Sequence, residues 1–155
     1  MYKTNFDSVV FAESREARIG VVIRNSNGEV VASLSKKIPY PDSVEVLEAL
    51  AVRRAAQFAV EVGICQSVFE GDLEVVCKAL KAANGSHPSI GQFVKDFLST
   101  MSSLRTFSFS HTRWQGNSVA HTLAKRARGS LPLLVWIELV PSNIYEFVVS
   151  DFVSA

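Results

Sequence analysis

The stretch Ser67–Leu80, SVFEGDLEVVCKAL, changes its pattern at Gly71. The residues before this glycine form a short apolar run that is typical of a strand. After it, apolar residues recur at helical spacing: Leu73, Val76, Cys77 and Leu80. Asp72 stands at the change, so we expect it at the carboxyl end of a strand, the edge where open α/β sheets bind ligands. The alternative role for such an aspartate is a plain helix N-cap.

Two further acids occupy comparable places. Asp7 interrupts the strand-like run Tyr2–Phe11, where aspartate is disfavoured. A carboxylate close to a core must be paired, hydrogen-bonded or bound to a metal. Glu48 follows Leu47 on a predicted helix and should lie at the rim of the side that faces the sheet. The sequence therefore predicts that Asp7, Glu48 and Asp72 come together.

Three carboxylates without a nearby lysine or arginine repel one another, and a divalent cation would relieve that repulsion. Oxygen-rich ligand sets suit Mg²⁺ or Mn²⁺ better than zinc. Two such ions about 3.5–4 Å apart can activate water and stabilise the leaving oxygen of a phosphodiester. The competing explanation is chance, because 20% of the residues are charged. Nearby acids are expected to be solvated charges: Glu45, Glu70 and Glu74.

The rest of the chain predicts a mixed sheet with helices packed on it. The predicted strands are Tyr2–Phe11, Arg18–Arg24, Glu29–Ile38, Gln66–Glu70 and Thr106–His111. The predicted helices run from about Ser43 to Val62 and over Asp72–Ala82, Ser89–Met101 and Gln115–Arg128. A hairpin turn is indicated at Asn25–Gly28, so the first three strands should form an antiparallel meander. Beyond Gly129 we expect a short strand or helix from Leu133 and then an extended tail.

The length of 155 residues predicts one main domain over residues 1–130, with residues 131–155 as a tail that packs on the domain or on a partner. The net charge of +1 excludes a global basic field, so any nucleic-acid contact must come from a local patch. We expect a monomer.

Cys65 and Cys77 are too few and too far apart for a disulfide framework or a zinc site. They are expected to be buried free thiols, which favours an intracellular location, cytoplasmic or nuclear. The N-terminal residues lack the apolar segment of a signal peptide. The most apolar stretch, Leu131–Val140, is too short to span a bilayer, so no membrane partner is expected.

Five segments, in order along the chain, resemble the ribonuclease H type 1 superfamily. The resemblance is greatest to the plant ribonuclease H-like domain found in reverse-transcriptase-related and stand-alone proteins. The segments are NFD (Asn5–Asp7), GVVIRNSNGEVV (Gly20–Val31), EALA (Glu48–Ala51), FEGD (Phe69–Asp72) and HTRWQGNSVAHTLA (His111–Ala124). The resemblance covers the chain from about Lys3 to Arg128.

This resemblance implies a ribonuclease H-like α/β fold, with a five-stranded mixed sheet of three antiparallel and then two parallel strands, flanked by helices. It also implies cleavage of the RNA strand of RNA–DNA hybrids with two Mg²⁺ or Mn²⁺ ions. Asp7 would be the first-strand carboxylate bridging both ions, Glu48 the first-helix carboxylate, and Asp72 the carboxylate that ends the fourth strand.

One departure from the family pattern affects the implied chemistry. Active members carry a fourth acid four residues after the asparagine of the last motif. This count from Asn117 reaches His121, which would fill the fourth catalytic place beside Asp7, Glu48 and Asp72. A neutral imidazole can bind a metal but brings no negative charge, so Mg²⁺ binding at the second site should be weaker. Three functions therefore stay open: an endoribonuclease, a catalytically weak or inactive nucleic-acid-binding module with the same fold, and exonuclease-like chemistry on the same scaffold.

The expected partner is nucleic acid, either an RNA–DNA hybrid or structured RNA. Binding would depend mainly on phosphate contacts. Arg113 and Asn117, beside the expected metal site, and Lys125, on the last helix, are the candidate binding residues. For Lys125, a favourable charge near the C-terminus of a helix is an equally good explanation.

Overall fold

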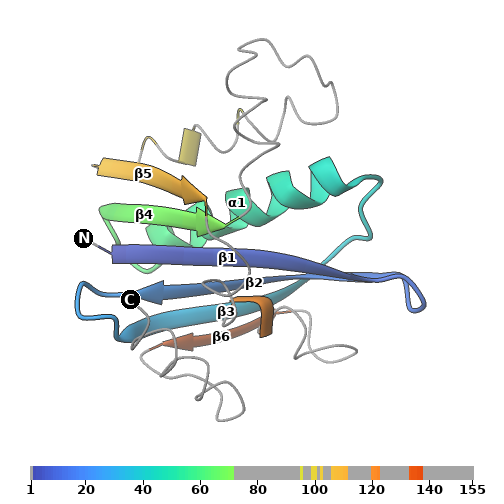
Figure 1. The fold of residues 1–155 in the computed structure, drawn as a ribbon, viewed down its shortest axis with the longest axis horizontal. Coiled ribbons are helices and arrows are strands. Elements are labelled where there is room, and N and C mark those ends of the chain that lie inside the picture. The colour runs from blue at the N-terminus through green and yellow to red at the C-terminus, as the bar shows by residue number, and fades with distance from the viewer. Residues whose placement is uncertain are drawn as a thin grey trace.

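The computed structural model describes residues 2–71, 95, 99–100, 102, 106–111, 120–122 and 133–137. These residues build one mixed sheet with strand order β5-β4-β1-β2-β3-β6, against which helix α1 packs (Figure 1). The elements are β1 (Tyr2–Phe11), β2 (Glu16–Arg24), β3 (Val30–Ile38), α1 (Val44–Glu61), β4 (Gln66–Gly71), β5 (Thr106–His111) and β6 (Leu133–Ile137).

The first three strands form the predicted antiparallel meander. The turn between β2 and β3 is held by the Asn25 side chain, whose Oδ1 accepts hydrogen bonds from the backbone N–H groups of Asn27 and Glu29 at 3.0 Å each. An asparagine that bonds to the backbone two residues later stabilises such turns. The local sequence therefore sets this connection.

The other predicted strands also form. After α1 the chain returns as β4, which pairs parallel to β1, and β5 pairs parallel to β4. A parallel pair needs such a crossover connection, and here α1 supplies it. The predicted arrangement of three antiparallel and two parallel strands is confirmed.

Within the residues that the structure describes, the sheet contains one strand more than the five that the resemblance implied. Leu133–Ile137 forms β6, which pairs antiparallel with β3 from Lys36 opposite Leu133 to Ala32 opposite Ile137. The apolar sequence LLVWI favours a strand, and its backbone satisfies hydrogen-bonding groups along the outer side of β3. The expectation of five strands is corrected to six, while the division of the chain after residue 130 stays a prediction.

Helix α1 begins and ends where its sequence indicates. The Ser43 side chain caps its start by accepting a hydrogen bond from the Val46 N–H at 3.2 Å. Gly63 follows its end with a φ of 84°, a left-handed conformation that suits glycine. The buried face of α1 joins the sheet in one hydrophobic core, which includes Phe6, Val21, Leu34, Leu47, Ala51, Ala55, Phe58 and Phe69.

Other predicted elements are described only in part. Lys95, Ser99 and Thr100 are helical within the predicted helix Ser89–Met101. Residues 120–122 are helical within the predicted last helix, while the predicted helix Asp72–Ala82, with Cys77, lies outside the described residues. No helix in the described part of the chain is long and apolar enough to cross a membrane.

Cys65 corrects one expectation. It is an exposed free cysteine rather than a buried one. It lies in the short connection between α1 and β4, just after Ile64, which supplies the buried side chain there.

Candidate active site

Asp7 lies on β1 just beyond the point where this strand separates from β4. The parallel pairing of β1 with β4 ends at Asn5 and Glu70, two residues before Asp7. On its other side Asp7 faces Gly20 of β2, which has no side chain to crowd the carboxylate. Its side chain is 25% exposed. Asp7 is therefore a partly buried acid at the edge where strands diverge, the usual place for a ligand site in such sheets.

His121 meets Asp7 at this place. Its Nδ1 lies 2.7 Å from Oδ2 of Asp7, although the two residues are 114 positions apart in the sequence. The neighbouring Ala120 is fully buried and anchors this part of the last helix. A contact of this length is a strong hydrogen bond, and an ion pair when the imidazole is protonated. The structure thus brings together two of the four predicted catalytic residues.

Glu48 approaches from α1. The residues around it, Leu47 and Ala51, pack in the same hydrophobic core as Phe6, the residue before Asp7. Glu48 is itself partly buried, and its Oε2 is inaccessible to solvent. Because a buried carboxylate oxygen is costly unless it is engaged, this burial is what a metal ligand or hydrogen-bonded acid would show. Helix α1 and β1 therefore carry Glu48 and Asp7 on adjacent segments of the backbone.

Asp72 lies outside the described residues, but the strand that leads to it ends beside Asp7. Gly71 is buried at the end of β4, and a Cβ atom placed on it would lie 2.6 Å from Cε2 and 2.8 Å from the carbonyl oxygen of Phe6. Only a residue without a side chain allows this approach. The backbone before Asp72 therefore touches the residue before Asp7, as the predicted carboxylate trio requires; the trio itself stays a prediction.

The three predicted nucleic-acid-binding residues, Arg113, Asn117 and Lys125, also lie outside the described residues and stay predictions.

The types of donor atom on these residues are those that a divalent cation prefers. Asp7 and Glu48 offer carboxylate oxygens, which suit Mg²⁺ and Mn²⁺, and the imidazole of His121 adds a nitrogen that Mn²⁺ accepts more readily than Mg²⁺ does. In the described part of the chain, which includes Asp7, Glu48 and His121 but not Asp72, no three histidine, cysteine, aspartate or glutamate side chains lie close enough together to hold a metal.

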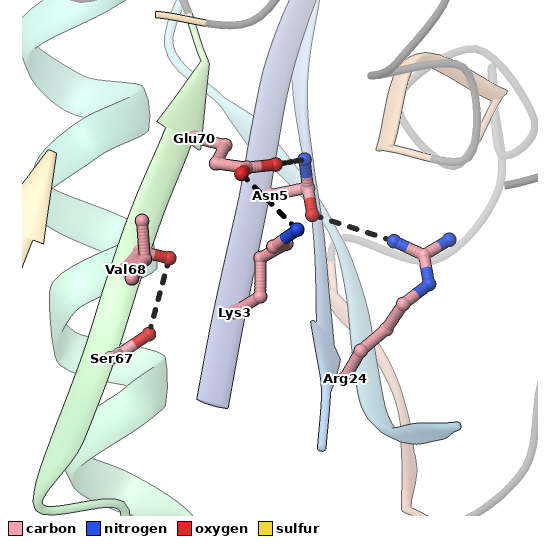
Figure 2. Close-up of polar contacts among 6 residues, drawn as sticks. All are labelled: Lys3, Asn5, Arg24, Ser67, Val68 and Glu70. Carbon is pink, nitrogen blue, oxygen red and sulfur yellow. Dashed lines mark hydrogen bonds and ion pairs between the residues drawn. The ribbon is translucent and has the colours of Figure 1, made fainter. Parts of the chain in front are cut away.

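A polar network next to Asp7 was not predicted. Asn5 is fully buried, donates from Nδ2 to Oε2 of Glu70 at 3.0 Å, and accepts at Oδ1 from Nη1 of Arg24 at 3.4 Å (Figure 2). Lys3 adds an ion pair to Oε1 of Glu70 at 3.5 Å. Glu70 is therefore not the solvated charge that was expected. The network joins β4, β1 and β2 immediately before Asp7, and the signal for it was the asparagine two positions before this acid, on the same face of the strand.

A second pair of polar side chains joins the same two strands from the opposite face. The buried hydroxyl groups of Thr4 and Ser67 form a hydrogen bond of 2.8 Å. With both faces of the pairing between β1 and β4 bonded in this way, the backbone that carries Asp7 is held firmly. This rigidity is what a metal or substrate site needs.

Comparisons with known proteins agree with this architecture. Residues 5–127 match the family model described as reverse transcriptase-like. No curated protein sequence matches the chain significantly. RNase H1 from the archaeon Halobacterium salinarum superposes with a TM-score of 0.72 at 22% identity, over 82% of this chain and 96% of that one.

Two further solved structures share the fold. LC11-RNase H1, isolated from compost and solved in complex with an RNA/DNA hybrid, has a TM-score of 0.70 at 17% identity, over 81% of this chain and 95% of that one. The protease–reverse transcriptase of prototype foamy virus has a TM-score of 0.54 at 14% identity, over 84% of this chain and 21% of that one. The strand order, the site around Asp7 and the match over residues 5–127 lead to one conclusion: the chain is a ribonuclease H-like domain that belongs to the reverse transcriptase-like family.

Proposed function

We propose that this protein is a metal-dependent endoribonuclease that cleaves the RNA strand of RNA–DNA hybrids. The observation that carries the proposal is the 2.7 Å contact between Asp7 and His121, which joins the first strand to the last helix at the diverging edge of the sheet. The relative that was solved with an RNA/DNA hybrid shares this fold and supports the choice of substrate.

Asp7, Glu48 and Asp72 would hold the two divalent ions. When bound, these ions supply an activated water and stabilise the leaving 3′ oxygen of the scissile phosphate. His121 would orient the Asp7 carboxylate by donating a hydrogen bond from Nδ1. The other ring nitrogen, Nε2, would then face away from this carboxylate. Because these acids are partly buried, bulk water would have little access to the carboxylates and to the cations that they bind.

The same contact also favours a second function, a nucleic-acid-binding module with weak or no catalysis. The imidazole of His121 takes up one oxygen of Asp7, and it brings no negative charge where active relatives of the resembled family carry an acid. If this hydrogen bond excludes one cation, the domain would bind nucleic acid without cutting it.

The deciding experiment is cleavage of an internally labelled RNA–DNA hybrid with Mg²⁺ and then with Mn²⁺. We expect Asp7→Asn, Glu48→Gln and Asp72→Asn each to lower the rate by about 100-fold or more, because even residues that only support a metal ligand typically contribute about 10–100-fold. Glu45→Gln, one helical turn before Glu48, removes the same charge outside the proposed ligand set and should leave the rate unchanged.

The products distinguish the alternatives. Internal cuts support an endoribonuclease, whereas single nucleotides released from one end would indicate exonuclease chemistry. An intact hybrid with both metals, bound with an affinity that falls as salt rises, would support the binding module and reject the enzyme.

A further inference from the structure

Arg15 and Tyr40 form a stacked pair on the surface. Cζ of Arg15 lies 4.8 Å from the centre of the Tyr40 ring. Arg15 lies in the connection between β1 and β2 with a φ of 52°, the one non-glycine residue with positive φ in the described part of the chain. A left-handed conformation is unfavourable for a residue with a side chain. Residues held in this way often serve a function, so the pair is a candidate for one.

The pair lies at the same end of the sheet as the candidate active site. Beyond Asp7, β1 runs on to Phe11 and enters the connection that contains Arg15, while Tyr40 lies between β3 and α1. Figure 1 shows the β1–β2 hairpin and the β3–α1 connection at one end of the sheet. Four residues of strand separate Asp7 from Phe11, which corresponds to about 13 Å.

A second path along the surface leads to the same pair. Val44 is one helical turn before Glu48 on the same stripe of α1, and this residue is 64% exposed. Tyr40, which is 36% exposed, lies just before this turn. A ligand that reaches the carboxylates and extends toward the start of α1 would therefore meet Val44 and then Tyr40.

The chemistry of the pair suits a nucleic-acid backbone. The guanidinium of Arg15 lies over the Tyr40 ring, and an arginine in such a contact keeps N–H groups that can donate to a phosphate. The carboxylate of Glu16, the residue after Arg15, forms an ion pair with Lys37 at 3.2 Å and accepts a hydrogen bond from the Ser14 hydroxyl at 3.1 Å. An exposed tyrosine ring offers a surface on which a sugar or base can pack.

We propose that Arg15 and Tyr40 bind the backbone of a nucleic-acid duplex whose scissile phosphate lies at Asp7. This inference rests on the proposed function and names a contact outside the metal site. Duplexes rise about 3.4 Å per base pair, so the ~13 Å of strand from Asp7 to Phe11 places the contact, which lies beyond Phe11, about four base pairs or more from the cut, on one side of it.

The test measures hybrid binding by fluorescence anisotropy over a series of salt concentrations, without divalent ions so that nothing is cleaved. Arg15→Gln should lower the affinity and reduce the slope of log affinity against log salt by about 0.9, the value for one lost phosphate contact. Arg15→Lys keeps the charge and should keep the slope. Tyr40→Ala should weaken binding on the order of tenfold, and Tyr40→Phe, which keeps the ring, should bind as the wild type does.

The position of the contact is tested by cleavage. Wild type and Arg15→Gln should differ on hybrids that extend five or more base pairs beyond the cut on one side, and should become equal on hybrids that end within two. Urea unfolding of each variant measures whether the contact between Arg15 and Tyr40 only stabilises the packing of the β1–β2 hairpin against the β3–α1 connection. A loss of stability without any change in affinity or salt slope would overturn the inference.

The two proposals fail separately. If the wild type binds hybrid with a salt slope that depends on Arg15 but never cuts it, the contact stands and the endoribonuclease does not. If the wild type cuts hybrid while Arg15→Gln binds with unchanged affinity and slope, the endoribonuclease stands and the contact does not.

Discussion

Replacing Gly71 by alanine should destabilise the protein and disturb the place where Asp7 and Asp72 are expected to meet. The added Cβ would lie 2.6 and 2.7 Å from two ring atoms of Phe6 and 2.8 Å from its carbonyl oxygen. The ring can rotate, but the carbonyl belongs to β1, whose register is fixed by pairing on both sides. Part of the clash can therefore be relieved only by moving the strand that carries Asp7.

The magnitude follows from these contacts. Overpacking a buried site costs about 1–3 kcal/mol, and a clash with backbone belongs in the upper half of that range. The alanine also reduces the freedom of the unfolded chain, which returns about 0.4–1 kcal/mol. The net loss should be about 2 kcal/mol, which at a slope of about 2 kcal/mol per M lowers the urea midpoint by about 1 M.

Urea unfolding, followed by circular dichroism and by tryptophan fluorescence, measures this loss. Gly63→Ala is the matched control, because its φ is 84° but nothing lies within 4 Å of the added Cβ. It should show only the conformational penalty, about 1 kcal/mol. Phe6→Leu in the Gly71→Ala background removes the two ring contacts. The loss of unfolding free energy in the double variant should therefore be about 1 kcal/mol smaller than the sum of the losses in the two single variants.

A Gly71→Ala protein with a midpoint within about 0.3 M of the wild type would refute the close approach of β4 to Phe6. If the approach is correct, the folded variant should also lose cleavage activity at saturating metal, since a displacement of about 1 Å at a reacting site can cost about 100-fold in rate.

Two further predictions concern single charges. His121→Asp should raise Mg²⁺-dependent cleavage and increase the thermal stabilisation by Mg²⁺, because a second carboxylate beside Asp7 needs a cation; an unchanged or lower activity would show that missing charge is not the defect. Burial, and after it repulsion by Arg54 and Arg53, lowers the pKa of Lys36, so its ammonium destabilises the folded state at neutral pH. Lys36→Met should therefore raise the urea midpoint at pH 7. This gain should fade as the pH rises through the lowered pKa of Lys36 toward 10.5, where Lys36 of the unfolded chain also releases its proton. A gain that stays constant with pH would contradict this.

Much of the fold was predictable because short-range physics determines it. The strand Thr106–His111 has the predicted bounds, and Ser43 caps α1 as its position before the apolar periodicity indicated. Alternation, helical spacing, caps and turn residues act over a few positions, so a single sequence contains them in full. The same local signals marked Asp7 and Glu48, because a carboxylate within an apolar pattern needs a special environment.

The partners of these residues were decided only by the tertiary structure. The apolar run from Leu133 was compatible with a short strand or a helix, and nothing local shows that it would pair with β3. The buried amide of Asn5, which joins Glu70 to Arg24, likewise depends on the register of three strands. A sequence pattern records which side chains must be buried and not which distant groups will satisfy them.

Local patterns in the chain were enough to predict the order of the described elements, the meander, the capped helix and the acids that stand out from their surroundings. Only the tertiary structure placed His121 against Asp7 across 114 positions and brought Gly71 onto Phe6. The physical reason is that strand register and the crossover of α1 set distances between remote segments, whereas the local pattern sets only which face of an element each side chain occupies.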